Sequence, residues 1–328
     1  MKKFVLSILL VAVVVATGCR STLPSWNEGE AKSQLKELVK GATCKRSPSY
    51  IPPEQRVAVF DLDGTLYSES YPVFFCFALY AHRVLEDPAY KPTEEEVAVA
   101  KEALATGKTP PLSDKDWVST VFAGMKREEI REYVKRFVEE DQPGYTGLKR
   151  RDAFFKPMRE VVKYLVDNGF KVFVVSGTDR EITRGLAEII GVPMWQVVGT
   201  DNVLVFSKQK DETYMQHIWE RDEEVLQSEK RTDINLQMKK VEAIINEIGV
   251  RPVIAFGNAM TDASMLNYAA FGKGGRAFVL IPDDMEREYG NAAEAEKLRA
   301  ACKTYGWIPV SMKDDWATIY GSDVKKQK

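Results

Sequence analysis

The sequence predicts an α/β fold, in which helices cover both faces of a doubly wound, mostly parallel sheet and a helical cap is inserted after the first strand. Short apolar runs without polar alternation, such as RVAVFDLD and RPVIAFGN, are typical of strands that are buried on both faces. Amphipathic helical patterns alternate with these runs, which indicates repeated βα units. Between residues 71 and 142 there are helical patterns and no convincing strand, so the alternation is interrupted directly after the first strand.

The first residues of the 328-residue chain indicate export. A basic start, MKK, precedes an apolar run from Phe4 to Ala16 that is shorter than the ~20 residues a membrane-spanning helix needs. Small residues then lead to Cys19 in VATGCRST, which resembles the lipobox of bacterial lipoproteins, with Ala16 where leucine is commonest. We therefore expect a signal peptide at residues 1–18, lipid on Cys19, and a location in the bacterial cell envelope or periplasm, anchored to a membrane. An ordinary secretory signal with an incidental cysteine is the alternative.

Residues 19–52 have the pattern of a tether. One short amphipathic stretch, roughly residues 28–40, lies there between proline and glycine breakers. We expect a single helix in a segment that leads the globular domain away from the membrane. The α/β core is then expected at 53–70 and 143–328, with the cap at 71–142.

The expected elements of the core follow in order along the chain. Its strands are RVAVFDLD, KVFVVSGT, WQVVGT, RPVIAFGN, AFVLIPDD and GWIPVSM. A helix at 157–168 begins with proline and is followed by glycine, and a second helix at 240–248 precedes RPVIAFGN. In the cap, Thr93 and Glu96 form a capping box for one of the helices. Residues 201–235 are expected to be irregular.

Composition excludes several classes of function. The formal net charge is -2 and there is no strong basic stripe, so we expect no nucleic-acid partner. The two histidines, His82 and His217, stand alone, which disfavours a histidine-based triad or metal cluster. A disulfide between Cys44 and Cys302 remains open, because spacing alone cannot establish it.

Polar residues gather where the predicted strands end. In open α/β sheets, ligands bind outside the carboxyl ends of the strands. The residues at those ends are Asp61 and Asp63 after the first strand, Ser176, Gly177 and Thr178 after the second, and Gly257, Asn258 and Asp262 after the fourth. Lys240 opens the helix before that fourth strand. We expect these side chains to converge on one edge of the sheet.

This set of residues suits phosphoryl transfer. Asp61 and Asp262 can hold Mg²⁺, which prefers hard oxygen ligands and lets neighbouring carboxylates stay ionised. A carboxylate can attack phosphorus, while the Ser176 hydroxyl and the Lys240 ammonium stabilise charge on the phosphoryl oxygens. Asp63 is placed to protonate the leaving oxygen and later to activate water.

Each of these residues alone has an ordinary structural explanation. DLDGT resembles a capped turn, Ser176 a helix cap, and Asp262 an acid favoured by a helix dipole. Lys240 alone would be a surface lysine, and its neighbour Lys239 competes for the same role. Their order along the chain and their convergence at one edge favour a chemical site.

Four segments together resemble the haloacid dehalogenase superfamily. DLDGT is similar to its first motif, VVSGT to the second, KVEAI to the third and GNAMTD to the fourth. The resemblance extends from about residue 56 to residue 320 and is strongest to the phosphoserine-phosphatase-like branch, whose members carry a helical cap after the first motif.

The resemblance implies a role for each matched residue. Asp61 would be the nucleophile and a Mg²⁺ ligand, Asp63 the general acid/base with its backbone carbonyl on the metal, Ser176, Gly177 and Lys240 the phosphate-binding residues, and Asp262 the remaining metal ligand. Ala259 and Met260 replace a polar pair that is common in relatives, which leaves the metal affinity open.

We therefore expect a Mg²⁺-dependent phosphomonoester hydrolase that acts through an aspartyl-phosphate on a small phosphorylated metabolite in the cell envelope. A phosphotransferase or phosphomutase on the same scaffold is one alternative. A non-catalytic envelope lipoprotein that binds a phosphorylated ligand or a protein partner is another. Tyr67, Ser68 and Tyr71 are candidates for substrate contact, with simple packing at the cap hinge as the alternative.

Overall fold

A six-stranded sheet forms the centre of the computed structural model, which describes residues 22–69, 71–110, 116–210 and 213–327. The strands are β1 (Val57–Phe60), β3 (Lys171–Asp179), β4 (Val197–Thr200), β7 (Ile254–Gly257), β8 (Arg276–Ile281) and β9 (Ile308–Ser311). They lie in the order β4-β3-β1-β7-β8-β9, and every neighbouring pair is parallel. The order reverses at β1, so the sheet is doubly wound as the sequence predicts.

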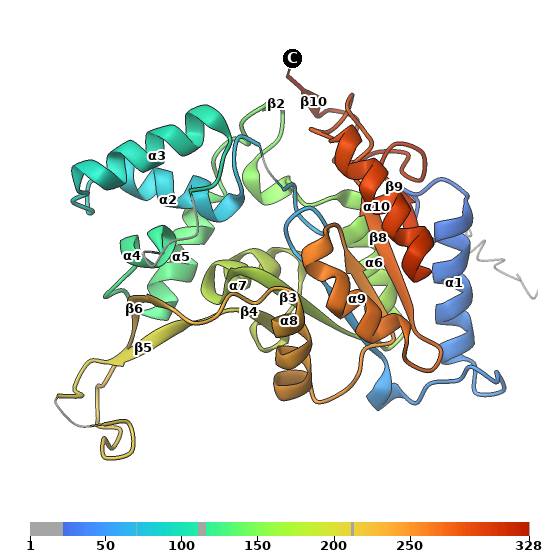
Figure 1. Ribbon diagram of the computed structural model, residues 1–328, viewed down its shortest axis with the longest axis horizontal. Helices are drawn as coiled ribbons and strands as arrows, with labels where there is room; N and C mark the ends of the chain where they lie inside the picture. Colours follow the sequence, from blue (N-terminus) through green and yellow to red (C-terminus); the bar gives the residue numbers. More distant parts are fainter. Residues whose placement is uncertain (1–21, 70, 111–115, 211–212, 328) are drawn as a thin grey trace, which may run out of the picture.

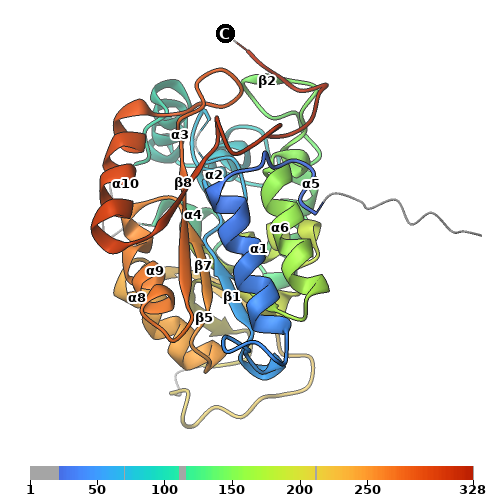
Figure 2. The same cartoon turned by 90° about the vertical axis from the view of Figure 1, so that its right-hand side faces the viewer.

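Both faces of the sheet are buried, which explains the apolar runs without polar alternation. Alternate residues of β1 enter two apolar cores: Ala58 and Phe60 belong to the first, and Val57 and Val59 to the second. Helices α1 (Glu30–Thr43) and α6 (Lys156–Asp167) cover one face, while α8 (Met238–Ala243), α9 (Ala263–Ala270) and α10 (Ala292–Tyr305) cover the other. Figure 2 shows the two groups of helices on opposite sides of the strands.

Between β1 and the short strand β2 (Tyr145–Thr146), the described residues form four helices, which lie at the left of Figure 1. They are α2 (Phe75–Leu85), α3 (Glu94–Thr106), α4 (Trp117–Val121) and α5 (Arg127–Phe137). The predicted capping box begins α3: Thr93 Oγ1 accepts from Glu96 N at 3.2 Å, and Glu96 Oε2 accepts from Thr93 N at 2.8 Å. Strand β2 follows these helices and pairs with β10 (Lys325–Lys326) at the end of the chain.

The segment expected to be a tether is part of the core from residue 23 onward, so that expectation was wrong there. Leu35 and Val39 of α1 are fully buried in the same apolar core as α6. Trp26 Nε1 donates to the carbonyl of Pro157 at 3.0 Å. Burying each large apolar side chain contributes about 1.5–3 kcal/mol, which an extended tether would forgo. Residues 1–21, with the predicted signal peptide and Cys19, lie outside the described residues.

Residues 201–235 are more regular than expected. They form an antiparallel hairpin of β5 (Asn202–Phe206) and β6 (Val225–Arg231), which extends from the lower left of the molecule in Figure 1. Only one face of this hairpin is partly buried and its loop is long, so its alternation is weak in the sequence.

Shorter elements complete the fold. They are α7 (Arg180–Ala187), a π-helical turn at Ile244–Ile248, and 3₁₀ turns at Pro53–Gln55, Arg150–Asp152, Glu188–Ile190, Met194–Gln196 and Met260–Asp262. Cys44, Cys76 and Cys302 are free thiols, so the disulfide left open by the sequence is not formed. Among the described residues there is no helix with the length and apolar character needed to cross a membrane.

Candidate active site

A buried lysine lies at the centre of the carboxyl edge of the sheet. Lys240, only 1% exposed, donates from Nζ to Asp61 Oδ1 and to Asp262 Oδ1, at 2.6 Å each. Burial alone would lower the pKa of Lys240, but the charges of Asp262 and Asp61 raise it above its usual value. Lys239, the competitor in the sequence, instead pairs at the surface with Asp233 and Glu242. The structure thus places Lys240, and not Lys239, between the two predicted carboxylates.

Asp262 is held by main-chain donors. Its Oδ2 accepts from the N–H groups of Asn258 and Ala259 at 3.1 and 3.2 Å. A Cβ atom on Gly257 would approach this oxygen to 2.7 Å, so the position requires glycine. The carboxylate therefore has a fixed orientation, with Oδ1 directed to Lys240.

The two acids that follow β1 have different surroundings. Burial raises the pKa of Asp61 to about 7, with a further contribution from the charge of Asp262, while Lys240 opposes the increase. Burial also raises the pKa of Asp63 to about 6. Asp63 Oδ2 accepts from the Thr178 hydroxyl at 2.8 Å, and its buried Oδ1 has no hydrogen-bond partner in the described structure. Asp61 is thus paired with a cation, while Asp63 is bonded only to a neutral hydroxyl.

The turn after β1 needs glycine at one position. Gly64 has a φ of 72°, in the left-handed region, and its N–H donates to the carbonyl of Tyr67 at 2.7 Å. A Cβ atom there would lie 2.0 Å from Asn258 Nδ2. Asn258 also accepts from the Thr65 hydroxyl at 3.1 Å. This close packing fixes the turn after β1 against the end of β7.

Ser176 is fully buried at the end of β3, and its Oγ accepts from Thr178 N at 3.0 Å. A hydroxyl has one donor and two acceptor positions, so this bond leaves the donor of Ser176 for another group. Gly177 and Thr178 line the cavity described below, whereas Ser176 is not among its lining residues. The sequence places Thr178 at the end of this strand but assigns it no role, because a threonine there has no distinctive pattern.

A cavity of about 310 Å³ lies over this edge, between the core and the cap. Asp61, Asp63 and Lys240 line it from the core, and Phe74 and Phe77 line it from the cap. Asp61, Asp63 and Lys240 therefore share one cavity, as the sheet topology requires.

Glu69 is a further acid of this cavity that sequence reasoning missed. Burial raises the pKa of its carboxyl to about 8, the charge of Asp63 adds to the effect, and a hydrogen bond with Asn258 opposes it. The sequence signal that could have identified Glu69 is its position shortly after the DLDGT motif.

Tyr67, Ser68 and Tyr71 are not among the residues that line the cavity. Tyr67 donates its hydroxyl to the carbonyl of Arg150 at 2.8 Å, and Tyr71 stacks on Tyr289 with ring centroids 3.9 Å apart. Packing at the hinge, the alternative for these residues, is what the structure shows.

The donor chemistry at this edge fits a hard divalent cation. Mg²⁺ is held in proteins by one or two carboxylates, with waters and substrate phosphate completing its shell. Among the described residues, no group of three or more His, Cys, Asp or Glu side chains is arranged to hold a metal. A site here would therefore rest on the carboxylates of Asp61 and Asp262 and the main-chain oxygen of Asp63. The raised pKa values of Asp61 and Asp63 reflect buried acids whose ionised forms a nearby cation would stabilise.

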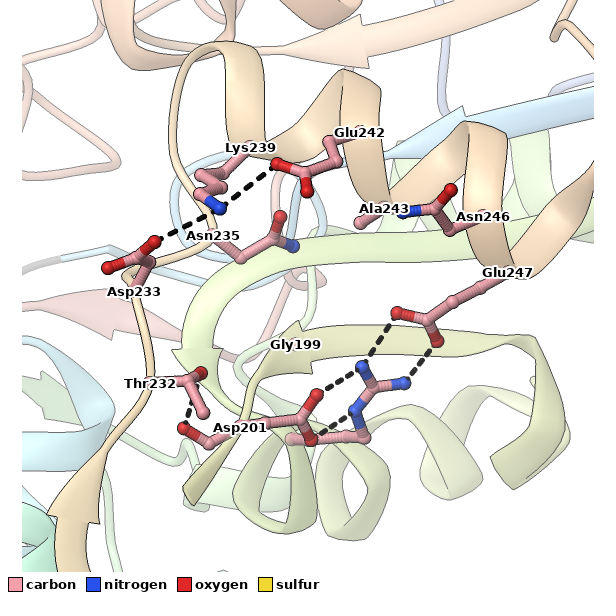
Figure 3. A pocket seen from close by; sticks show the side chains of 11 residues that line it. Gly199, Asp201, Thr232, Asp233, Asn235, Lys239, Glu242, Ala243, Asn246 and Glu247 are labelled. Atoms are coloured by element: carbon pink, nitrogen blue, oxygen red, sulfur yellow. Dashed lines mark hydrogen bonds and ion pairs between the residues drawn. The ribbon is translucent and has the colours of Figure 1, made fainter. Parts of the chain in front are cut away.

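A second pocket, of about 220 Å³, is lined by residues that include Gly199 of β4, Asn235 and Glu247 (Figure 3). Its cations are already paired: Arg180 with Asp201 and Glu247, and Lys239 with Asp233 and Glu242. This leaves no unengaged cation among its described lining residues to attract an anion.

The wall of this second pocket supports the candidate site. Asn235 Nδ2 donates to the carbonyl of Ser176 at 3.0 Å, and Thr200 Oγ1 donates to that of Gly177 at 2.6 Å. These bonds fix the backbone at the end of β3.

Comparison with known proteins gave one family and several structural relatives. The family model for haloacid dehalogenase-like hydrolases matches residues 58–267. A search of curated proteins gave no match. A conserved functionally unknown protein from Anaerococcus prevotii DSM 20548 has 14% sequence identity and a TM-score of 0.57, with 94% of this chain and 99% of that chain covered. This likeness shows a shared fold.

Two further solved structures are less similar. A protein with unknown function from Bordetella pertussis Tohama I has 15% identity and a TM-score of 0.49, with 78% of this chain and 98% of that chain covered. A phosphoserine phosphohydrolase-like protein from Francisella tularensis subsp. tularensis SCHU S4 has 14% identity and a TM-score of 0.36, with 74% and 99% covered. Both scores are too low for a conclusion about activity.

Proposed function

The chain belongs to the haloacid dehalogenase-like hydrolases, and from this premise we propose that it is a Mg²⁺-dependent phosphomonoesterase that acts through an aspartyl-phosphate on Asp61. The observation that carries the proposal is the buried Lys240, bonded to both Asp61 and Asp262 at the edge where Asp63 also faces the cavity. A buried charged cluster of this kind is costly to maintain for stability alone, so it indicates a functional site.

In the first step, a carboxylate oxygen of Asp61 attacks phosphorus. Lys240 holds Asp61 Oδ1 at 2.6 Å, which leaves Oδ2 for the new bond to phosphorus. As the bond from phosphorus to the leaving oxygen breaks, Asp63 transfers its proton to that oxygen, and the alcohol departs. The products of this step are the alcohol, an aspartyl-phosphate and an ionised Asp63.

In the second step, Asp63 takes a proton from water, and the water oxygen attacks the same phosphorus. The bond between phosphorus and Asp61 breaks, which releases inorganic phosphate and restores both acids. Burial raises the pKa of Asp63, so its carboxyl holds a proton more readily than that of an exposed aspartate.

The remaining residues at this edge of the sheet orient the acids and neutralise negative charge. The main-chain donors of Asn258 and Ala259 fix Asp262 beside Lys240. The Ser176 hydroxyl, the Gly177 backbone and the Lys240 ammonium are the candidate partners of the phosphoryl oxygens. Mg²⁺, held by Asp61, Asp262 and the Asp63 carbonyl, would neutralise negative charge on the phosphoryl group when bound.

The test is the release of inorganic phosphate from a panel of phosphate monoesters by the purified protein, with Mg²⁺ and with EDTA. We expect turnover with Mg²⁺, loss of turnover with EDTA, and loss in Asp61→Asn at unchanged circular dichroism. Transfer to an added alcohol in preference to water would instead support a phosphotransferase. Binding of phosphate esters without turnover would support the non-catalytic alternative.

We also propose that the protein is exported and anchored by lipid on Cys19, which rests on the sequence of residues 1–19 alone. Mass spectrometry of the N-terminal peptide from membrane fractions tests it. A lipid-modified Cys19 at the start of the mature chain is expected, and an unmodified Cys19 would contradict the anchor.

A further inference from the structure

The side of the cavity opposite the acids is apolar. Phe74 precedes α2 and Phe77 lies three residues later, so both are on the helix face that points to the cavity, while Phe75 and Ala78 are buried in the core. Ile234 and Leu236, from the segment between β6 and α8, form the facing wall. In the proposed reaction this is the space for the leaving group, since the acids and Lys240 occupy the other side.

The charge of the lining disfavours a charged leaving group. Among the described residues that line the cavity, Lys240 is the only cation, and Asp61 and Asp262 already engage it. Glu69, the acid nearest the cap, is bonded to Asn258. A carboxylate or second phosphate on the leaving group would therefore lose its hydration without gaining an unengaged cation among the lining residues that the structure describes.

Backbone hydrogen bonds join the cap to the β5–β6 hairpin. Gly124 N donates to the carbonyl of Gln227 at 2.8 Å, and Gln227 N donates to that of Met125 at 3.0 Å, which joins the turn before α5 to β6. Lys126 pairs with Glu224 at 2.8 Å next to these bonds. Figure 1 shows β6 lying beside α4 at this junction.

A second junction joins the cap to α7. Glu181 is 2% exposed and is paired with Arg127 and Arg131 of α5. Moving the cap away from α7 and β6 would break this buried ion-pair cluster as well as the backbone bonds, which is costly, so the cap that carries Phe74 and Phe77 is held in place.

We propose that this subsite accepts a compact, uncharged and largely apolar alcohol, so that the substrates are aryl or short alkyl phosphate monoesters. The inference rests on the proposed phosphatase activity and adds the class of its leaving group. A hydrophobic pocket discriminates by about 10–200-fold for each methylene that it gains or loses, so an apolar leaving group has a measurable advantage here.

The experiment compares kcat/KM of the purified protein, with Mg²⁺, for five esters. These are phenyl phosphate, n-butyl phosphate, glycerol phosphate, 3-phosphoglycerate and phosphoethanolamine. We expect the two apolar esters to exceed each of the others by about tenfold or more. Equal or better turnover of glycerol phosphate, 3-phosphoglycerate or phosphoethanolamine would overturn the inference. A preference for phosphoethanolamine would indicate that the carboxyl groups of the cavity bind a positively charged leaving group.

Two variants connect this preference to the cavity. Phe77→Ala and Ile234→Ala are each expected to lower kcat/KM for phenyl phosphate about tenfold, with the inhibition constant of inorganic phosphate unchanged. Phe271→Ala, at a 65% exposed position outside the cavity, is the control and is expected to change neither quantity. An unchanged preference in both cavity variants would overturn the assignment of these walls.

The experiment distinguishes a failure of the leaving-group class from a failure of the proposed phosphatase activity. Turnover of all five esters with similar efficiency, abolished by Asp61→Asn, overturns only the leaving-group class. Absence of turnover for every ester overturns the phosphatase and the leaving-group class together.

Discussion

Replacing Lys240 with methionine tests whether the ammonium is needed to hold two buried carboxylates together. Methionine keeps the unbranched shape of the side chain but removes both 2.6 Å bonds, to Asp61 and to Asp262. Breaking a buried ion pair by removing one partner costs about 3–5 kcal/mol, because the remaining charge stays buried. We expect the free energy of unfolding of Lys240→Met to fall by about this amount at pH 8 in EDTA.

The pH dependence of this loss has a definite sign. The pKa of Asp61 is about 7 in the folded protein and 3.8 as its reference value, so the folded state binds more protons between these values. Stability of the wild type from this group therefore falls as pH rises from about 4 to about 7. Lys240 lowers the pKa of Asp61, so its removal extends the fall to higher pH, and the loss in Lys240→Met is larger at pH 8 than at pH 5.

The assay is urea unfolding at pH 5 and pH 8, in EDTA, followed by circular dichroism. The matched control is Lys239→Met, whose side chain is 44% exposed and pairs with Asp233 and Glu242 at the surface. Surface pairs contribute about 0–1 kcal/mol, so the control is expected to lose no more than that. A loss in Lys240→Met no larger than in Lys239→Met, or equal losses at the two pH values, would refute the reasoning.

Three further predictions follow from the geometry. Asp63→Asn is expected to lower kcat by about 10²–10⁴-fold in steady-state phosphate release, because it removes the proton donor and keeps the shape; a change below tenfold would contradict that role. Gly64→Ala is expected to destabilise the protein more than Gly191→Ala in thermal unfolding. Both glycines have a positive φ, but a Cβ atom on Gly64 would lie 2.0 Å from Asn258, whereas one on Gly191 would meet nothing within 4 Å. Equal losses of stability in the two variants would show that the contact with Asn258 is unimportant. Leu35→Ala is expected to lower the free energy of unfolding by about 2–5 kcal/mol, because Leu35 is fully buried. A loss below about 0.5 kcal/mol would instead indicate that α1 does not belong to the core, as expected of a tether.

The sheet and the position of the acids were predictable because they depend on short-range patterns. A strand buried on both faces must be apolar throughout, and a parallel sheet brings the ends of its strands to one edge. The sequence therefore predicts that Asp61, Asp262 and Lys240 lie close together, and the structure brings them within hydrogen-bond distance.

The environment of the site was less predictable, because it depends on contacts between distant segments. Thr178 bonds Asp63 across 115 positions of the chain, and Glu69 contacts Asn258 from the start of the cap. Neither residue type is distinctive in its local sequence. Tyr67 was named as a candidate for substrate contact and Glu69 was not, because the direction in which a side chain points from an irregular turn has no periodic signal.

The role of α1 was mispredicted for a related reason. Its amphipathic pattern indicates one apolar face but not what covers that face, and a helix that follows an export signal suggested a tether. The core that receives Leu35 is built from residues far along the chain, including Trp316 and Met158. The weak alternation of β5 and β6 was missed because only one face of that hairpin is partly buried.

The central claim is that Asp61 forms a covalent bond to phosphorus. The direct measurement is mass spectrometry of the peptide that contains Asp61, after the protein has turned over phenyl phosphate with Mg²⁺, been quenched in acid and been reduced with borohydride. We predict that Asp61 is recovered in its reduced form in the wild type, in proportion to the enzyme quenched during turnover, and that Asp61→Asn neither turns over nor is modified. Continued phosphate release with no modification of the Asp61 peptide, or activity that persists in Asp61→Asn, would contradict the mechanism.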